Sequence, residues 1–157
     1  MYNALNYYEQ FTNITSLVLI GYGLGGSLAQ LFALDLVINF SGFKQNFFIS
    51  NLYTYASPAI GNLNFVKYAE QKLSESLNFK FRITYFKDPS PHFPENFSQL
   101  VREIYYDLNY KFTICKDSIG VSAANCSSQH LTNFDIEDVY KYFKQDSRKI
   151  LQSCLNN

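Results

Sequence analysis

Asp88 and His130 are residues of the two types that activate a hydroxyl nucleophile. An imidazole takes the proton of such a nucleophile, and a carboxylate holds the imidazole in the correct tautomer and orientation. A tight turn between a strand and a helix can present the nucleophile itself. The glycine-rich residues 21–25, which read GYGLG, have the spacing of such a turn, but their central residue is Gly23. Glycine has no side chain, so the surroundings of a nucleophile are present without the nucleophile.

The residues on either side of Gly23 predict the elements that position it. The apolar run Leu17–Ile20 is short enough for a buried strand. The segment from Gly26 to Asn39 is apolar on nearly every side, which is typical of a helix packed inside a core. Gly25 and Gly26 would allow the strand and this helix to approach closely at the turn.

The next segments predict a parallel sheet. Leu52–Ala56 is rich in residues that favour strands and is stopped by Ser57 and Pro58. A helix over 62–77 follows, with Asn62 as its cap and an apolar stripe at helical spacing. Phe79–Tyr85 alternates apolar and polar residues, as a strand does. Strands that alternate with helices indicate parallel crossover connections, and Asp88 then lies in a proline-rich loop at the carboxyl end of a strand.

The remaining segments complete the expected fold. Residues 2–13 have apolar residues at helical spacing, which predicts a short helix before the first strand. Two strands around 103–106 and 110–115 are close enough in sequence to form an antiparallel hairpin through 107–109. A polar loop over 116–130 precedes a helix that begins near Asp135. Val139, Phe143 and Ile150 are expected to face inward from that helix.

Composition excludes several classes of protein. Thirteen basic and thirteen acidic residues cancel, and no run of like charges occurs, so no nucleic-acid partner is indicated. No apolar stretch approaches the roughly 20 residues of a membrane span. Met1 is followed by neither a basic nor an apolar region, so no signal peptide is predicted in this chain. The length is that of about one domain.

Four segments together resemble the fungal-type, or class 3, lipase family of α/β-hydrolases. Residues 21–29 resemble the family's G-H-S-L-G-G-A-L-A elbow, and residues 53–62 resemble its next strand and turn. Residues 88–94 resemble the D-P-V-P-x-L-P loop that carries the catalytic aspartate. Residues 126–131 are similar to a Cys-Ser segment that leads to the family's histidine, though shorter. The segments occur in the family's order over nearly the whole chain.

The resemblance implies an α/β-hydrolase-like fold of the α/β class, with a mostly parallel sheet and helices on both faces. Residues 1–157 would form a single, partial class 3 lipase-like domain. The family's early strands, lid and one oxyanion-hole donor belong to an amino-terminal half that has no counterpart in this sequence. The strand at Leu17–Ile20, central in hydrolase sheets, is therefore expected to form an open, apolar edge.

The resemblance also assigns the site residues. Gly23 stands at the nucleophile position, where the family has serine, and Asp88 and His130 stand at the other two catalytic positions. Leu24 would supply a backbone N–H to the oxyanion hole, with its side chain in the core. Tyr22 is expected to pack rather than react.

Further expectations concern two other polar residues, the cysteines and the location of the protein. Ser27 is expected to point along its helix and to be a poor substitute nucleophile, and His92 is expected to have a structural role. The resemblance supports a disulfide between Cys115 and Cys126. It also implies a secreted or secretory-pathway protein, while the residues themselves leave the location open.

The resemblance implies ester hydrolysis without a cofactor or metal, on lipid esters such as triacylglycerols. Partners would be a lipid or ester ligand, a transient lipid interface and the missing amino-terminal segment. Gly23 predicts that catalysis is impaired in this chain. Two alternatives stay open: a non-catalytic protein that binds lipids or acyl groups, and a truncated or engineered copy of an active lipase.

Overall fold

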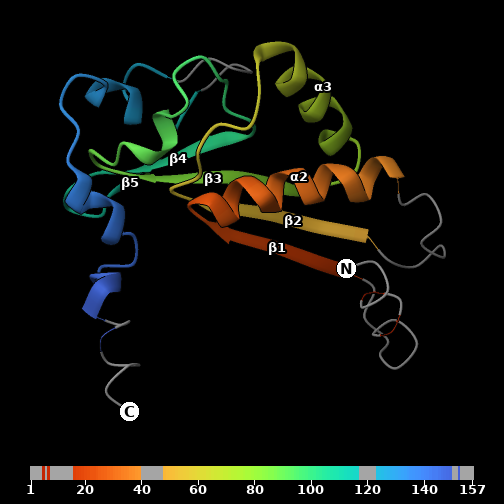
Figure 1. The fold of residues 1–157 in the computed structure, drawn as a ribbon, viewed down its shortest axis with the longest axis horizontal. Helices are drawn as coiled ribbons and strands as arrows, with labels where there is room; N and C mark the ends of the chain where they lie inside the picture. Colours follow the sequence, from red (N-terminus) through yellow and green to blue (C-terminus); the bar gives the residue numbers. More distant parts are fainter. Residues whose placement is uncertain are drawn as a thin grey trace.

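The computed structural model describes residues 5, 7, 16–39, 48–116, 123–149 and 152. Its core is one five-stranded sheet with the strand order β1-β2-β3-β4-β5 (Figure 1). The strands are β1 (Ser16–Tyr22), β2 (Phe48–Tyr55), β3 (Phe79–Tyr85), β4 (Arg102–Tyr106) and β5 (Phe112–Ile114). The first four strands run parallel to one another, and β5 is antiparallel to β4. The predicted mostly parallel sheet and the predicted hairpin are confirmed.

Two α-helices connect the first three strands. They are α2 (Leu24–Asn39) and α3 (Leu63–Ser74). The Asn62 side chain accepts a hydrogen bond from the Phe65 N–H at 2.9 Å, as the predicted cap requires. The apolar stripe of α3 is buried, together with residues of α2 and β2. None of the described helices is long and apolar enough to cross a membrane.

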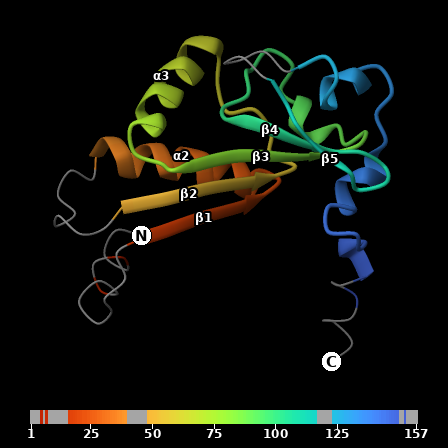
Figure 2. The same ribbon diagram turned by 180° about the vertical axis from the view of Figure 1, so that it is seen from behind.

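Both of these helices lie on the same face of the sheet (Figures 1 and 2). In the described part of the chain, α2 and α3 are the helices expected on one face of the sheet. The other face is covered by a short 3-10 helix, η3 (Ile136–Tyr140), and by Tyr142 next to it, near the carboxyl ends of the strands. The predicted helix over 2–13 lies mostly outside the described residues, although Leu5 and Tyr7 are helical.

The carboxyl-terminal segment differs from its predicted form. In place of a long helix with Val139 and Phe143 inside, η3 is short, and the Phe143 side chain is 58% exposed. Asp138 and Tyr142 are buried instead, because each has a specific polar partner. Ile150 lies outside the described residues. Apolar periodicity thus misidentified which side of this segment faces the protein.

Apolar side chains form a surface along the open strand β1 and on the face of the sheet opposite α2. In the described part of the chain β1 pairs only with β2, and its Ile20 side chain is 66% exposed. The strand register places Ile20, Tyr53 and Phe81 in one row across this face. The strand contains no charged residue or proline, the features that usually protect an edge from pairing. Among the described residues, β1 is thus the open edge that was predicted.

We expect the isolated chain to self-associate through this edge, since an unprotected apolar edge strand is a template for another chain. Ile20→Lys should shift the protein towards monomer in sedimentation equilibrium. Tyr68→Lys is the matched control, because Tyr68 is an exposed residue on α3, away from β1. A concentration-independent monomer for the unmodified chain would contradict this expectation.

Candidate functional site

The turn between β1 and α2 has the geometry of a strained elbow. Gly23 follows the last residue of β1 and has φ +54°, in the left-handed region. Its N–H donates to the Tyr55 carbonyl at 2.8 Å, which ties the turn to the end of β2. An L-residue in this region typically costs about 1 to 3 kcal/mol, a strain that glycine avoids. A Cβ at Gly23 would meet no atom within 4 Å, so the turn has space for a side chain that is absent.

The start of α2 packs closely on the turn after β2. A Cβ on Gly26 would lie 2.8 Å from the Ser57 Cβ, so glycine is needed there for close approach. No atom lies within 4 Å of a Cβ at Gly25, so the expected packing reason applies to Gly26 alone. The Ser27 hydroxyl is buried in this contact and donates to the Pro58 carbonyl at 3.0 Å. Ser27 is therefore placed for packing rather than for attack.

Leu24 begins α2 next to Gly23. The expectation that its side chain lies in the core is wrong, because the side chain is 72% exposed. It lies on the same helix surface as the exposed Leu28 and Leu31, one and two turns further along α2. The proposed oxyanion role concerns its backbone N–H and stays a prediction.

Asp88 lies just beyond the carboxyl end of β3 and is only 2% exposed. One carboxylate oxygen accepts from the Ser90 N–H at 2.7 Å, and the other accepts from the Tyr142 hydroxyl at 2.5 Å. Burial raises the pKa of Asp88, while the hydrogen bonds from Tyr142 and Ser90 oppose that rise, and the nearby Asp138 adds to it. The carboxylate is thus buried and already has donors on both oxygens.

Tyr142 joins Asp88 to the elbow. Its ring packs edge-on against Tyr22 at 5.7 Å between centroids, and against Tyr55 at 6.4 Å. Burial, with the adjacent Asp88 charge, raises the pKa of the Tyr142 hydroxyl well above its usual value, so it stays a donor at neutral pH. No sequence signal identified this residue, because it is one of thirteen tyrosines and lies in a segment whose apolar spacing was misleading.

Tyr22 packs, as expected, and does not point its hydroxyl at the Gly23 position. The hydroxyl donates to the Val139 carbonyl, which links the end of β1 to η3. Burial, and secondarily the charge of Asp88, raises the pKa of Tyr22 to about 12. The elbow and the carboxyl-terminal segment are therefore in direct contact.

His130 lies at the end of a second 3-10 helix, η2 (Ser127–His130), next to β4. Its Nε2 lies 2.9 Å from the Tyr105 hydroxyl, and its ring packs edge-on against Phe86 at 5.0 Å. Burial, and secondarily the positive charge of Lys87, lowers its pKa. Within the described residues, the hydrogen bonds of His130 do not reach Asp88, whose oxygens are taken by Tyr142 and Ser90. The structure thus brings Asp88 close to the elbow without joining His130 to either.

The predicted disulfide between Cys115 and Cys126 is present and holds the segment before His130 against β5. Beside it, Glu103 accepts from the Arg82 guanidinium at 3.0 Å and from the Ser127 N–H at 3.2 Å. Glu103 and the two cysteines form the one group of potential metal ligands found among the described residues. Because the sulfurs are joined to each other, this group is a structural cross-link beside a buried ion pair.

His92 has the structural role expected of it. It lies in the 3-10 helix η1 (Ser90–His92), and its ring stacks on Phe134 with 5.3 Å between centroids. Burial lowers its pKa, so the ring is favoured in its neutral form. The stack joins the Asp88 loop to the segment that leads into η3.

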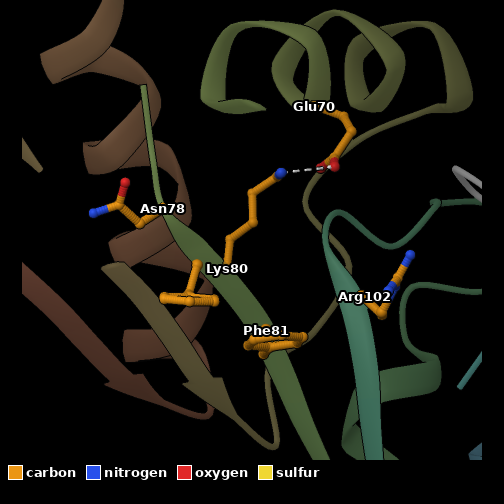
Figure 3. Close-up of a pocket in the computed structure, with 6 residues that line it drawn as sticks. Glu70, Asn78, Lys80, Phe81 and Arg102 are labelled. Carbon is orange, nitrogen blue, oxygen red and sulfur yellow. Dashed lines mark ion pairs between the residues drawn. The ribbon is translucent and has the colours of Figure 1, made fainter. Parts of the chain in front are cut away.

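A separate pocket of about 190 Å³ lies at the amino ends of β3 and β4 (Figure 3). Its walls include Phe79, Phe81 and Arg102, and an ion pair of 3.1 Å between Lys80 and Glu70 closes one side. The elbow and Asp88 lie at the opposite, carboxyl ends of the parallel strands. This pocket is therefore not part of the candidate ester site.

Two known lipases are similar to this chain in amino-acid sequence. A triacylglycerol lipase OBL1 of Ricinus communis is 30% identical over 125 residues, which are 73% of this chain and 23% of that protein. The secreted mono- and diacylglycerol lipase A of Penicillium camembertii is 37% identical over 78 residues, which are 50% of this chain and 22% of that protein. The chain thus spans less than a quarter of the length of these relatives.

Solved structures agree in fold. Lipase II from Rhizopus niveus superposes with a TM-score of 0.73 at 22% identity, over 92% of this chain and 53% of that chain. The Rhizomucor miehei triacylglyceride lipase gives 0.69 at 24% identity, over 90% of this chain and 52% of that chain. At these identities the likeness concerns the fold.

The family model described as "Lipase (class 3)" matches residues 3–98, which include β1, the elbow, α2, β2, α3, β3 and Asp88. The match covers more than half of the chain and contains the elbow and Asp88, whereas His130 and Tyr142 lie beyond its last residue. The chain belongs to the class 3 lipase family.

Proposed function

We propose that this chain is a lipase-family protein that has lost ester hydrolysis. The observation that carries the proposal is Gly23, which occupies the centre of the elbow and offers no oxygen for attack. Loss of a triad nucleophile typically lowers turnover by about a million-fold. The buried Ser27 next to the turn supports the same conclusion, since its hydroxyl is engaged with Pro58.

The state of Asp88 gives independent support. In a triad the carboxylate orients an imidazole. In this chain the donors to both Asp88 oxygens are the Ser90 N–H and the Tyr142 hydroxyl. A tyrosine whose pKa is raised by burial can donate this bond but is a poor base at neutral pH. The site is thus organised to keep a buried carboxylate stable.

The ligands of the ancestral site would be lipid esters, because relatives of this chain are named as lipases of triacylglycerols and of mono- and diacylglycerols. A non-catalytic protein that binds acyl chains is the second candidate. The exposed apolar side chains of β1 and α2, such as Ile20 and Leu28, favour it. The disulfide supports a location in an oxidising compartment.

A third alternative concerns the rest of the fold. The chain spans about half of the solved lipases that it matches. We propose that a complete site, with a lid and a second oxyanion donor, would need residues in addition to the 157 of this chain. Activity of any longer protein would still require an attacking group at the Gly23 position.

The purified chain should not hydrolyse a short-chain nitrophenyl ester above the rate of buffer, because no hydroxyl is placed at the elbow. Asp88→Asn and His130→Ala should leave that background unchanged. An active fungal lipase under the same conditions serves as the positive control. Turnover by the unmodified chain that falls in Asp88→Asn or His130→Ala would show that a functional site exists and would overturn the proposal.

Tyr142→Phe should destabilise the protein more at pH 7 than at pH 4. Burial raises the folded pKa of Asp88, so the stability associated with this group is present below its unfolded pKa and is lost as pH rises through the folded pKa. Removal of the Tyr142 hydroxyl raises the folded pKa of Asp88 further, because the hydrogen bond from Tyr142 lowers it, and so enlarges the loss of stability. The expected cost at pH 7 is about 1.5 to 3 kcal/mol, typical of a hydrogen bond to a charged group.

Urea unfolding of the two proteins at both pH values measures this difference. In an Asp88→Asn background the effect of Tyr142→Phe should no longer depend on pH. An equal loss at pH 4 and pH 7 in the unsubstituted background would mean that the contribution of the Tyr142 hydroxyl does not depend on the charge of Asp88, and would contradict the prediction.

A further inference from the structure

An imidazole that serves both a carboxylate and a nucleophile must come from a residue between them, because its two nitrogens bond to the two groups. In this chain those groups would lie at Asp88 and at position 23, beyond the carboxyl ends of β3 and β1. His130 instead contacts Tyr105 and Phe86. The segment that lies in space between Asp88 and the elbow is further along the sequence, at residues 138–142.

Three contacts fix this segment. The Lys87 N–H, adjacent to Asp88, donates to the Asp138 carboxylate at 3.3 Å. The Tyr22 hydroxyl, adjacent to Gly23, donates to the Val139 carbonyl. The Tyr142 hydroxyl donates to Asp88 itself. Residue 139 is therefore held between the neighbour of Asp88 on one side and the neighbour of Gly23 on the other.

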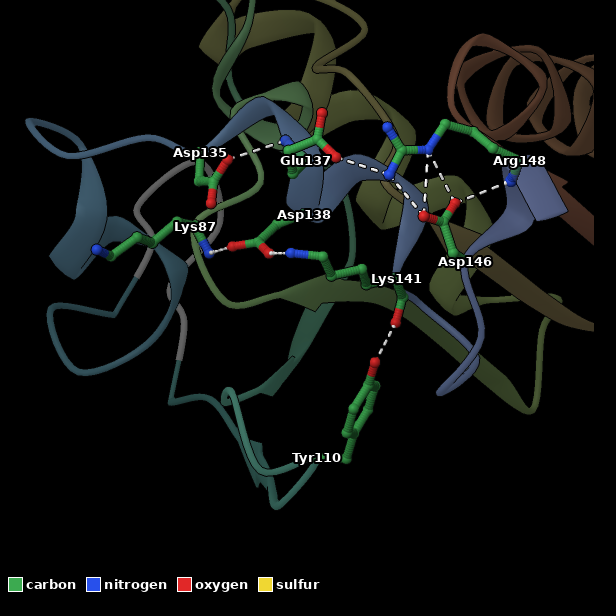
Figure 4. A network of polar contacts seen from close by, with 8 residues as sticks. All are labelled: Lys87, Tyr110, Asp135, Glu137, Asp138, Lys141, Asp146 and Arg148. Atoms are coloured by element: carbon green, nitrogen blue, oxygen red, sulfur yellow. Dashed lines mark hydrogen bonds and ion pairs between the residues drawn. The ribbon is translucent and has the colours of Figure 1, made fainter.

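A wider polar network holds the segment in place (Figure 4). Lys141 Nζ lies 2.9 Å from Asp138, and the Lys141 carbonyl accepts from the Tyr110 hydroxyl at 2.8 Å. Arg148 bonds to both Glu137 and Asp146. None of these contacts involves the side chain of residue 139, so the position of this residue is set by its surroundings rather than by the side chain that it carries.

We propose that residue 139 occupies the general-base position of this site, so that Val139 together with Gly23 removes two of the three catalytic groups. This inference rests on the proposed loss of ester hydrolysis and extends it. A valine side chain cannot accept a proton, and Tyr142 then stabilises the carboxylate that is left without an imidazole. His130 is, on this assignment, a packing residue on Tyr105.

The two positions for the base predict different substitutions that would restore ester hydrolysis. With His130 as the base, Gly23→Ser alone would rebuild a triad. With residue 139 as the base, the serine would still lack a proton acceptor. Val139→His would be needed beside it, and His130 would be dispensable.

The direct test is NMR titration of the imidazole of Val139→His in the full chain. The charged and titratable residues that make the contacts around this position are Asp88, Asp138, Lys87, Lys141, Tyr22 and Tyr142. A carboxylate within bonding distance typically raises a histidine pKa by about 1 to 3 pH units. Asp88→Asn in the same background should remove most of that rise, whereas the pKa of His130 should not respond to Asp88→Asn.

The opposite pattern, with His130 sensitive to Asp88→Asn and the introduced imidazole insensitive, would overturn the proposal. The response of His130 can also be measured with Val139 in place, so the test holds even where Val139→His fails to fold. This readout does not depend on activity. Ester turnover by the unmodified chain would therefore refute the proposed function without deciding the position of the base.

Fluorophosphonate labelling of an introduced serine gives a second readout. Gly23→Ser combined with Val139→His should label at least about tenfold faster than Gly23→Ser alone, since a positioned general base contributes about 10² to 10⁴. His130→Ala should leave that gain intact. A gain that disappears with His130→Ala would assign the base to His130.

Discussion

The carboxylate of Asp88 is the group on which the organisation of the site depends. It is almost fully buried, and a buried carboxylate is costly unless each oxygen has a donor. The Ser90 N–H comes from the same loop and is supplied locally. The Tyr142 hydroxyl comes from a segment 54 residues away in sequence. Together with the hydrogen bonds of Lys87 and Tyr22 to residues 138 and 139, it holds the carboxyl-terminal segment across the ends of β1 and β3.

That segment in turn contacts the end of β1 beside the elbow. Tyr142 packs against Tyr22 and Tyr55, and the Tyr22 hydroxyl reaches the Val139 carbonyl. The elbow itself keeps the left-handed backbone at Gly23 and the close approach at Gly26. The scaffold that would hold a nucleophile is retained, and under the proposed function the groups that would react with an ester are replaced by groups that pack and donate hydrogen bonds.

Local patterns in the sequence were sufficient to predict most of the fold. The alternation in Phe79–Tyr85 predicted β3 with the same bounds, and the Asn62 cap was correct, because both depend on neighbouring residues. The disulfide followed from the resemblance to lipases. The carboxyl-terminal segment was predicted incorrectly, because its burial is decided by distant polar partners: Asp138 binds the Lys87 N–H, and Tyr142 binds Asp88. The side chain of Leu24 was wrongly predicted to be buried, because one face of α2 is exposed in the described part of the chain.

Under the proposed function, no residue of this chain acts as an activated serine nucleophile. Intact-protein mass spectrometry after prolonged treatment with a fluorophosphonate tests it most directly, with a catalytically active fungal lipase labelled in parallel. We expect the mass of the unmodified chain to stay unchanged while the control is fully labelled. A stoichiometric adduct on any serine, above all on Ser27 beside the elbow, would contradict it.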